Sequence, residues 1–313
     1  MIKTPLKYIL IPFSVIIALS LTGCGSSMPK ESSAEPSMTA TEPSVTEHAH
    51  VLGDGTLATA GIYTLQVLTV PRSKVEGSLS FKIIENDTIL NDFIERHTKN
   101  LHLVLVSEDL SEYIHTHPTM SEEGVWSVNM KFPEGGNWRL YADFGTSEEP
   151  NGVVLGSIIN VAGTSTITPL EAPAASFSAD GFDYTVSGRI PANDHGMLMI
   201  TITKDGKNVV FGEYLGSTGH LVAIRENDGA YAHFHPQGHN HSSASDSSEI
   251  DSNPATPSED GMGMEEESGS HSMAMPGMLH FDTEVPGAGK YRLFLEFMAE
   301  GKLHKIAFTA DVV

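Results

Sequence analysis

The chain contains the same pattern of residues twice. Residues 102–118 recur as residues 220–236 without a gap, and eight of the 17 positions are identical. A second pair of matching blocks, 133–144 and 286–297, follows in the same order. Two ordered blocks that repeat within one chain indicate a duplicated module. The offsets of the two blocks are 118 and 153, so the second copy carries an insertion of 35 residues between them.

Both copies contain short runs of alternating or β-branched residues in the same order, separated by Gly, Pro, Asn and Asp. In the first copy these runs are 64–70, 78–84, 102–108, 113–117, 126–132, 137–144 and 155–163. In the second copy they are 184–190, 197–203, 220–226, 231–235, 279–285, 290–297 and 305–313. About seven strands in about 100 residues are typical of an immunoglobulin-like antiparallel sandwich. We therefore predict an all-β chain with two tandem immunoglobulin-like β-sandwich modules.

The repeats also predict where the modules begin and end. We place module 1 at residues 48–163, a linker at 164–180 and module 2 at 181–313. Residues 89–98 are compatible with a short helix or with a loop.

Two segments lack the apolar residues that a folded core needs. Residues 24–47 are mainly Ser, Thr, Pro and Glu, so we expect a disordered tether. The insertion at 237–276 has eight acidic residues and no basic one, and it is rich in Ser, Gly and Met. We expect it to be a disordered surface loop.

The N-terminus has the order of a secretion signal. Two lysines precede an apolar stretch at 8–21, which is too short to favour a helix that spans a membrane. Residues 21–24, Leu-Thr-Gly-Cys, resemble the cleavage site of bacterial lipoproteins. The resemblance implies that residues 1–23 are a signal peptide and that Cys24 is acylated, with palmitate. It also implies an extracytoplasmic protein, lipid-anchored to the bacterial membrane; the alternative is an uncleaved anchor.

Composition and motifs exclude several classes of protein. Cys24 is the only cysteine, so no intramolecular disulfide, CxxC pair or cysteine zinc finger forms. Acylation would also remove the thiolate that a blue-copper site or a cysteine nucleophile needs. With 18 basic and 40 acidic residues the net charge is −22, so we expect no nucleic acid partner. We find no GxSxG, P-loop, HExxH or GxGxxG motif, and we therefore do not predict an enzyme.

Three histidines are expected to converge in each module. Residues two apart in a strand share a face, so His115 and His117 lie together. A hairpin centred between residues 109 and 110 would put His102 opposite His117 and Val104 opposite His115, with facing Cβ atoms about 4.5–5.5 Å apart. The same construction in the second copy brings together His220, His233 and His235.

Three imidazoles and one open position would suit Zn²⁺ or Cu²⁺. Two alternatives stay open. A register slip of one residue would move His102 to the opposite face of its strand. The repeated Tyr-x-His-x-His-Pro stretch could also be a structural corner, in which the imidazoles hydrogen-bond loop carbonyls.

Methionine and histidine also gather in and after the acidic insertion. Methionine usually fills cores, and it cannot do so in a hydrophilic segment. Thioether suits Cu(I), whereas imidazole suits Cu(II) and Zn, so we predict metal binding with copper ahead of zinc. The alternative is a solvated low-complexity tract. The candidate ligands are His239, His241, Met262, Met264, His271, Met273, Met275, Met278 and His280.

Other polar residues of the strands are expected to be structural. His97 stands alone in the sequence and is expected at the surface or with its hydrogen bonds satisfied. Arg139 and Arg292 lie inside aromatic runs, and we expect them to pair with Asp143, Glu296 or a backbone carbonyl.

The strand order and the repeated Gly-x-Tyr/Trp-Arg-Leu-x-x-x-Phe stretch, at 136–144 and 289–297, resemble exported sandwich domains of the YtkA-like group. The modules are more loosely similar to the copper-handling CopC-like and PCuAC-like periplasmic proteins. His271 and Met273 have an HxM spacing of the kind those chaperones use, although their other ligand spacings are not reproduced.

The sequence thus predicts a membrane-anchored lipoprotein that binds a transition metal, copper first and zinc second. It would buffer the metal or deliver it to an exported cuproenzyme or a metal transporter. The alternative is a non-enzymatic adhesion or assembly module with structural histidines. A copper- or zinc-dependent enzyme ranks third.

Overall fold

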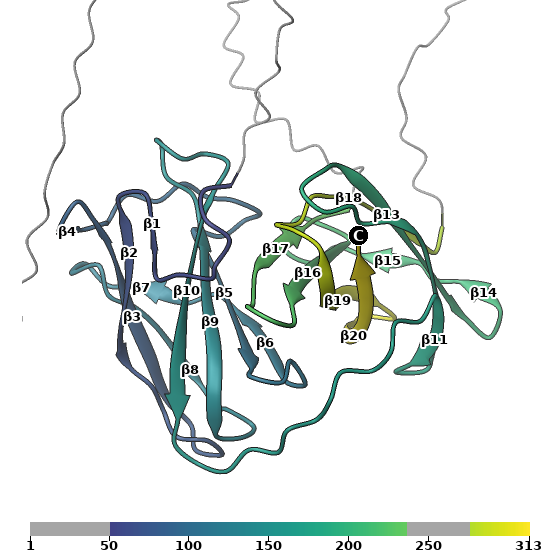
Figure 1. Cartoon of the computed structure of the whole chain (residues 1–313), viewed down its shortest axis with the longest axis horizontal. Helices are drawn as coiled ribbons and strands as arrows, with labels where there is room; N and C mark the ends of the chain where they lie inside the picture. The colour runs from purple at the N-terminus through teal and green to yellow at the C-terminus, as the bar shows by residue number, and fades with distance from the viewer. Residues whose placement is uncertain (1–50, 237–275) are drawn as a thin grey trace, which may run out of the picture. The chain divides into compact units, whose positions relative to one another are not determined.

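The computed structural model describes residues 51–236 and 276–313, and in these residues it contains strands and no helix (Figure 1). The strands of module 1 are β1 (Thr59–Ala60), β2 (Tyr63–Thr69), β3 (Gly77–Glu85), β4 (Thr88–Ile89), β5 (Leu101–Ser107), β6 (Tyr113–Thr116), β7 (Thr119–Met120), β8 (Trp126–Met130), β9 (Gly136–Phe144) and β10 (Val153–Val161). Those of module 2 are β11 (Ser176–Ala179), β12 (Phe182–Arg189), β13 (Gly196–Lys204), β14 (Lys207–Asn208), β15 (Phe211–Gly212), β16 (Gly219–Arg225), β17 (Tyr231–Phe234), β18 (Met278–Thr283), β19 (Gly289–Ala299) and β20 (Lys302–Val312).

Each module has two antiparallel sheets, and the strands that the two modules share follow the same order. In module 1 one sheet runs β1-β2-β3-β8-β7, with β4 on β3, and the other runs β10-β9-β5-β6. In module 2 the corresponding sheets are β11-β12-β13-β14, with β18 on β13, and β15-β19-β16-β17, with β20 on β19. The predicted all-β sandwich class is confirmed, and every run predicted as a strand contains one.

Of the two alternatives for residues 89–98, the loop is the one present: no helix forms between β4 and β5, and the isolated bridges Ile94–Gly145 and Arg96–Lys99 hold the loop. One segment differs from its prediction. The segment predicted as a linker ends in β11, which pairs with β12. Its four residues are too short a run to be recognised in the sequence, and the packing of Phe177 against the core of module 2 keeps the strand in place.

Each module has its own core, and a third apolar cluster joins them. Alternate residues of β5, such as Leu103 and Leu105, point into the core of module 1. The opposite face of β5, with Val104 and Val106, packs in one cluster with Val222 of module 2. All seven residues of β5 are therefore buried, because both faces of the strand are covered.

Candidate metal centre

The hairpins that carry the histidines have the predicted register. On β5 and β6, Val104 pairs with His115 and Val106 pairs with Tyr113. Asp109 closes the turn by accepting hydrogen bonds from the hydroxyls of Ser107 and Ser111. This turn fixes the register, and with it the face on which each histidine lies.

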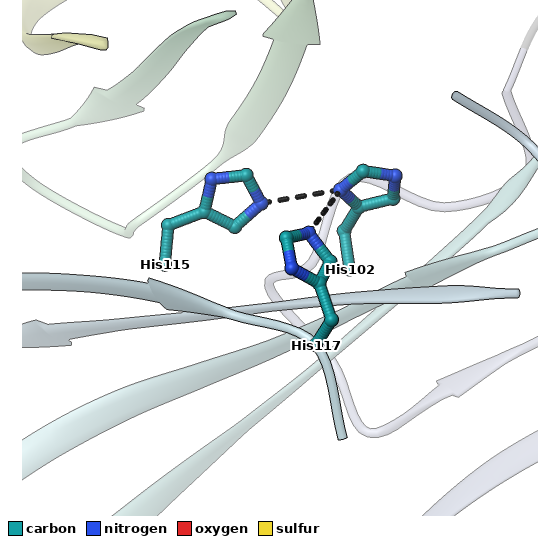
Figure 2. Close-up of side chains that lie close together, drawn as sticks. All are labelled: His102, His115 and His117. Atoms are coloured by element: carbon teal, nitrogen blue, oxygen red, sulfur yellow. Dashed lines mark hydrogen bonds between the residues drawn. The ribbon is translucent and has the colours of Figure 1, made fainter. Parts of the chain in front are cut away.

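The first hairpin brings together His102, His115 and His117, which we call cluster A (Figure 2). His102 Nδ1 lies 3.1 Å from His115 Nε2 and 3.2 Å from His117 Nε2. His102 and His115 are buried, and His117 is half-buried. Bonds of about 2.0–2.1 Å to a tetrahedral ion would put neighbouring ligand nitrogens about 3.3 Å apart. The spacing in cluster A therefore fits a transition-metal ion.

The hydrogen bonds on the outside of cluster A determine where its protons lie. His102 Nε2 is 3.2 Å from the carbonyl oxygen of Arg96, which can only accept, so Nε2 carries the proton. His115 Nδ1 donates in the same way to the carboxylate of Glu296, at 2.6 Å. In the neutral imidazoles the two inner nitrogens then face each other with lone pairs at 3.1 Å. Such an arrangement is repulsive unless a cation lies between them.

The second hairpin repeats the arrangement with His220, His233 and His235, which we call cluster B. Their three ligand atoms lie within 4.8 Å of one another. The Nδ1 atom of His220 and the Nε2 atoms of His233 and His235 are buried, and none has a hydrogen-bond partner among the described residues. These atoms correspond to the three inner nitrogens of cluster A. Because buried polar atoms nearly always have a partner, their convergence indicates a ligand.

Each cluster depends on a carboxylate from the other module. Glu296 on β19 of module 2 holds His115 of cluster A, and Asp143 on β9 of module 1 accepts from His233 Nδ1 of cluster B at 3.1 Å. Both carboxylates have a cationic partner. Arg96 Nη1 is 2.9 Å from Asp143 Oδ1, and Lys305 Nζ is 2.5 Å from Glu296 Oε1. Carboxylates that fix a histidine tautomer in this way accompany metal ligands in proteins.

This role of Asp143 and Glu296 was not predicted from the sequence. Of the partners expected for Arg139, the backbone carbonyl is the one present, because its Nη1 lies 3.4 Å from the carbonyl oxygen of Thr56 and it does not pair with Asp143. Four residues along a strand span about 13 Å, too far for a side-chain pair. One signal was available, because the repeated blocks align Asp143 with Glu296 inside otherwise apolar strands.

Burial favours the neutral form of His102, His117 and His220. It lowers the pKa of His102 to about 4 and that of His220 to about 3. Burial, followed by the neighbouring His115, lowers the pKa of His117 to about 3. Burial opposes ionisation of Glu296, but the bonds from His115 and Lys305 outweigh it and hold the pKa of this carboxyl at about 2. Near neutral pH these three imidazoles are thus in the form that binds metals, and Glu296 is an ionised carboxylate.

The other predicted ligands are not brought into these clusters. Met278 and His280 lie on β18, in the sheet of module 2 that does not carry cluster B. His97, expected at the surface or with its hydrogen bonds satisfied, is exposed, and its ring also stacks on His235 with centroids 3.4 Å apart. The predicted residues that lie outside the described part of the chain are Cys24, His239, His241, Met262, Met264, His271, Met273 and Met275. In the described ranges, no helix is long and apolar enough to cross a membrane.

A family comparison identifies where the chain belongs. The model of the family described as "Domain of unknown function (DUF8832)" matches residues 58–154 and 177–313. The chain belongs to this family. The two matched segments follow the two modules. This comparison shows neither a YtkA-like nor a copper-handling family. No curated protein matches the chain.

Several solved structures are similar to this chain. A protein from Corynebacterium diphtheriae described as membrane anchored is 11% identical, with a TM-score of 0.22, over 81% of this chain and 59% of that one. The Escherichia coli adhesin FdeC is 10% identical, with a TM-score of 0.21, over 84% and 66%. A tandem repeat from the extending region of a large adhesion protein is 9% identical, with a TM-score of 0.24, over 80% and 49%. This chain spans less than two thirds of each of these structures, and we infer no function from them.

Proposed function

We propose that this protein binds transition-metal ions at clusters A and B. The observation that carries the proposal is the pair of inner nitrogens of His102 and His115, which lie 3.1 Å apart with both of their protons committed to outer acceptors. A metal ion with three imidazole ligands satisfies all of these atoms at once.

Copper is the preferred metal and zinc the second. Both accept three neutral imidazoles, but Cu²⁺ binds such ligands more tightly than Zn²⁺. The methionines and histidines of residues 237–276 add soft ligands for Cu(I) and further imidazoles for Cu(II).

The N-terminal sequence supports a location outside the cytoplasm, with Cys24 acylated and anchored to the bacterial membrane. There the protein would buffer copper, or deliver it to an exported cuproenzyme or a metal transporter. Its acidic surface, with a net charge of −22 for the chain, attracts cations.

The alternative function is an adhesion or assembly module with structural histidines. A structural imidazole needs partners for its ring nitrogens, yet four nitrogens of cluster B have none in the described part of the chain. The metal-binding function therefore ranks first. An enzyme ranks third, since the cavity lined by Val106, Arg139 and Arg225 includes none of the clustered histidines.

The test is competition for Cu(I), Cu(II) and Zn(II) between the purified full-length protein and chelators of known affinity. Cluster A is removed by H102Q/H117Q and cluster B by H220Q/H235Q, while H195Q replaces a histidine whose side chain is 57% exposed and outside both clusters. We expect each double variant to lose one tight site, and H195Q to lose none.

The same variants distinguish the alternative function. Structural histidines would leave the metal affinity unchanged, and their replacement would lower the melting temperature of the metal-free protein. Equal, weak binding by the native protein and both double variants would overturn the proposal.

A further inference from the structure

We propose that clusters A and B hold their two ions as one binuclear centre that is shared by the two modules. This inference rests on the proposed function, because it requires that both clusters bind metal.

The rings of the two clusters are nearly as close across the module boundary, at 5.3–6.3 Å between centroids, as they are within a cluster, at 4.6–5.7 Å. Within cluster A the ring centroid of His102 is 5.4 Å from that of His115. Across the boundary it is 5.3 Å from that of His233, and the His115 ring is 5.8 Å from that of His220. The imidazoles are thus in one continuous group, and no further layer of side chains separates the two sets of ligand atoms.

The two carboxylates connect the clusters in a reciprocal way. Asp143 is directly opposite His102 of cluster A in the sheet ladder, and it binds His233 of cluster B. Glu296 is directly opposite His220 of cluster B, and it binds His115 of cluster A. In each cluster one ligand therefore depends on a hydrogen-bond partner from the other module.

The backbone around the two histidine clusters is held in place by apolar contacts that do not involve a metal. Val104, Val222 and Phe294 pack in one buried apolar cluster beside the histidines. The Tyr113 ring also stacks on Phe294, with centroids 4.4 Å apart. Because this contact joins the modules through rigid strands, the two sites are fixed at short range instead of being brought together by the ions.

Electron paramagnetic resonance of the Cu(II) protein tests the proposal. The full-length protein carries H239Q, H241Q and H271Q, so that the imidazoles of the insertion do not compete for the ion. At two equivalents of Cu(II) we expect the signature of a coupled pair, which is either a half-field line or loss of most of the ordinary signal. When H220Q/H235Q is added, we expect an ordinary mononuclear spectrum at one equivalent of Cu(II). When the control H195Q is added instead, we expect the signature of the coupled pair to remain.

The possible failures are distinct. Two bound ions with an ordinary spectrum of two independent spins would overturn the binuclear centre and leave metal binding intact. A single bound ion per chain would also overturn it, since six imidazoles would then form one site. No bound ion would overturn the proposed function itself. The decisive spectrum is that of unaltered clusters, so it does not depend on the folding of a cluster variant.

Discussion

At the scale of single residues, Glu296 and Asp143 determine which ring nitrogen of His115 and of His233 carries no proton. Each accepts the Nδ1 proton of a histidine on the other module, which leaves Nε2 to face the other two imidazoles. Each also pairs with a cationic side chain, Arg96 for Asp143 and Lys305 for Glu296, which offsets the cost of burying the carboxylate. The carboxylates therefore prepare the ligands without using an open coordination position.

This arrangement predicts a crossed effect. E296Q should weaken metal binding at cluster A, and D143N should weaken it at cluster B, each by roughly 10–100-fold. Each effect is measured by chelator competition in a protein in which the other cluster has been removed. E226Q is the control, because that carboxylate is 47% exposed and lies 3.7 Å from Lys290, away from the clusters. Weakening of the cluster in the same module as the substitution would contradict the assignment.

The lowered histidine pKa values predict how stability changes with pH in the metal-free protein. An unfolded histidine titrates near pH 6.5, whereas His102 and His220 titrate near 4 and 3 in the folded chain. Between these values the unfolded chain binds more protons. The free energy of unfolding should therefore be fully retained above about pH 6.5 and should fall as the pH is lowered toward 4.

Urea unfolding at pH 7.5, 6 and 5 in the presence of a chelator measures this dependence. The H102Q/H220Q variant should have a shallower slope, since glutamine does not titrate. A native profile that is flat between pH 7.5 and 5 would show that these histidines are not held neutral.

At the scale of elements, sequence reasoning predicted the hairpins well. A hairpin centred between residues 109 and 110 was assumed because it puts the three histidines on a single face, and this register is present. The loop at 89–98 was not predictable in the same way. It brings the Arg96 carbonyl to His102 and the ring of His97 to His235, and both contacts join residues without a shared periodicity.

The apolar face of β16 also has a measurable role. V222A removes two methyl groups from a fully buried position between the modules, which should lower the free energy of unfolding by about 2 kcal/mol. V210A is the matched control, because Val210 is 81% exposed, and it should have no measurable effect. Urea unfolding of the metal-free proteins makes the comparison. An equal loss in both variants would mean that the β16 face is not buried in solution.

At the scale of the whole molecule, the duplication predicted both clusters but not that they face each other. Alternation identifies an apolar face without identifying what covers it. One signal was present in the run Leu-His-Leu-Val-Leu-Val-Ser at 101–107, which is apolar on both faces. Such runs are typical of strands that are buried on both sides. The cover for the second face of β5 is the other copy of the module.

A centre shared by two modules should hold them together when the chain between them is cut. A protease site placed at 172–175, which is exposed and outside the strands, would divide the protein into its two modules. After cleavage we expect the halves to elute together from a sizing column with copper and to separate more readily with a chelator. The reason is that metal binding requires His115 with Glu296 and His233 with Asp143, so each occupied site makes separation of the modules less favourable. The D143N/E296Q variant should lose most of the copper dependence while keeping the apolar contact. Halves that separate equally with and without copper would show that each module binds its ion alone.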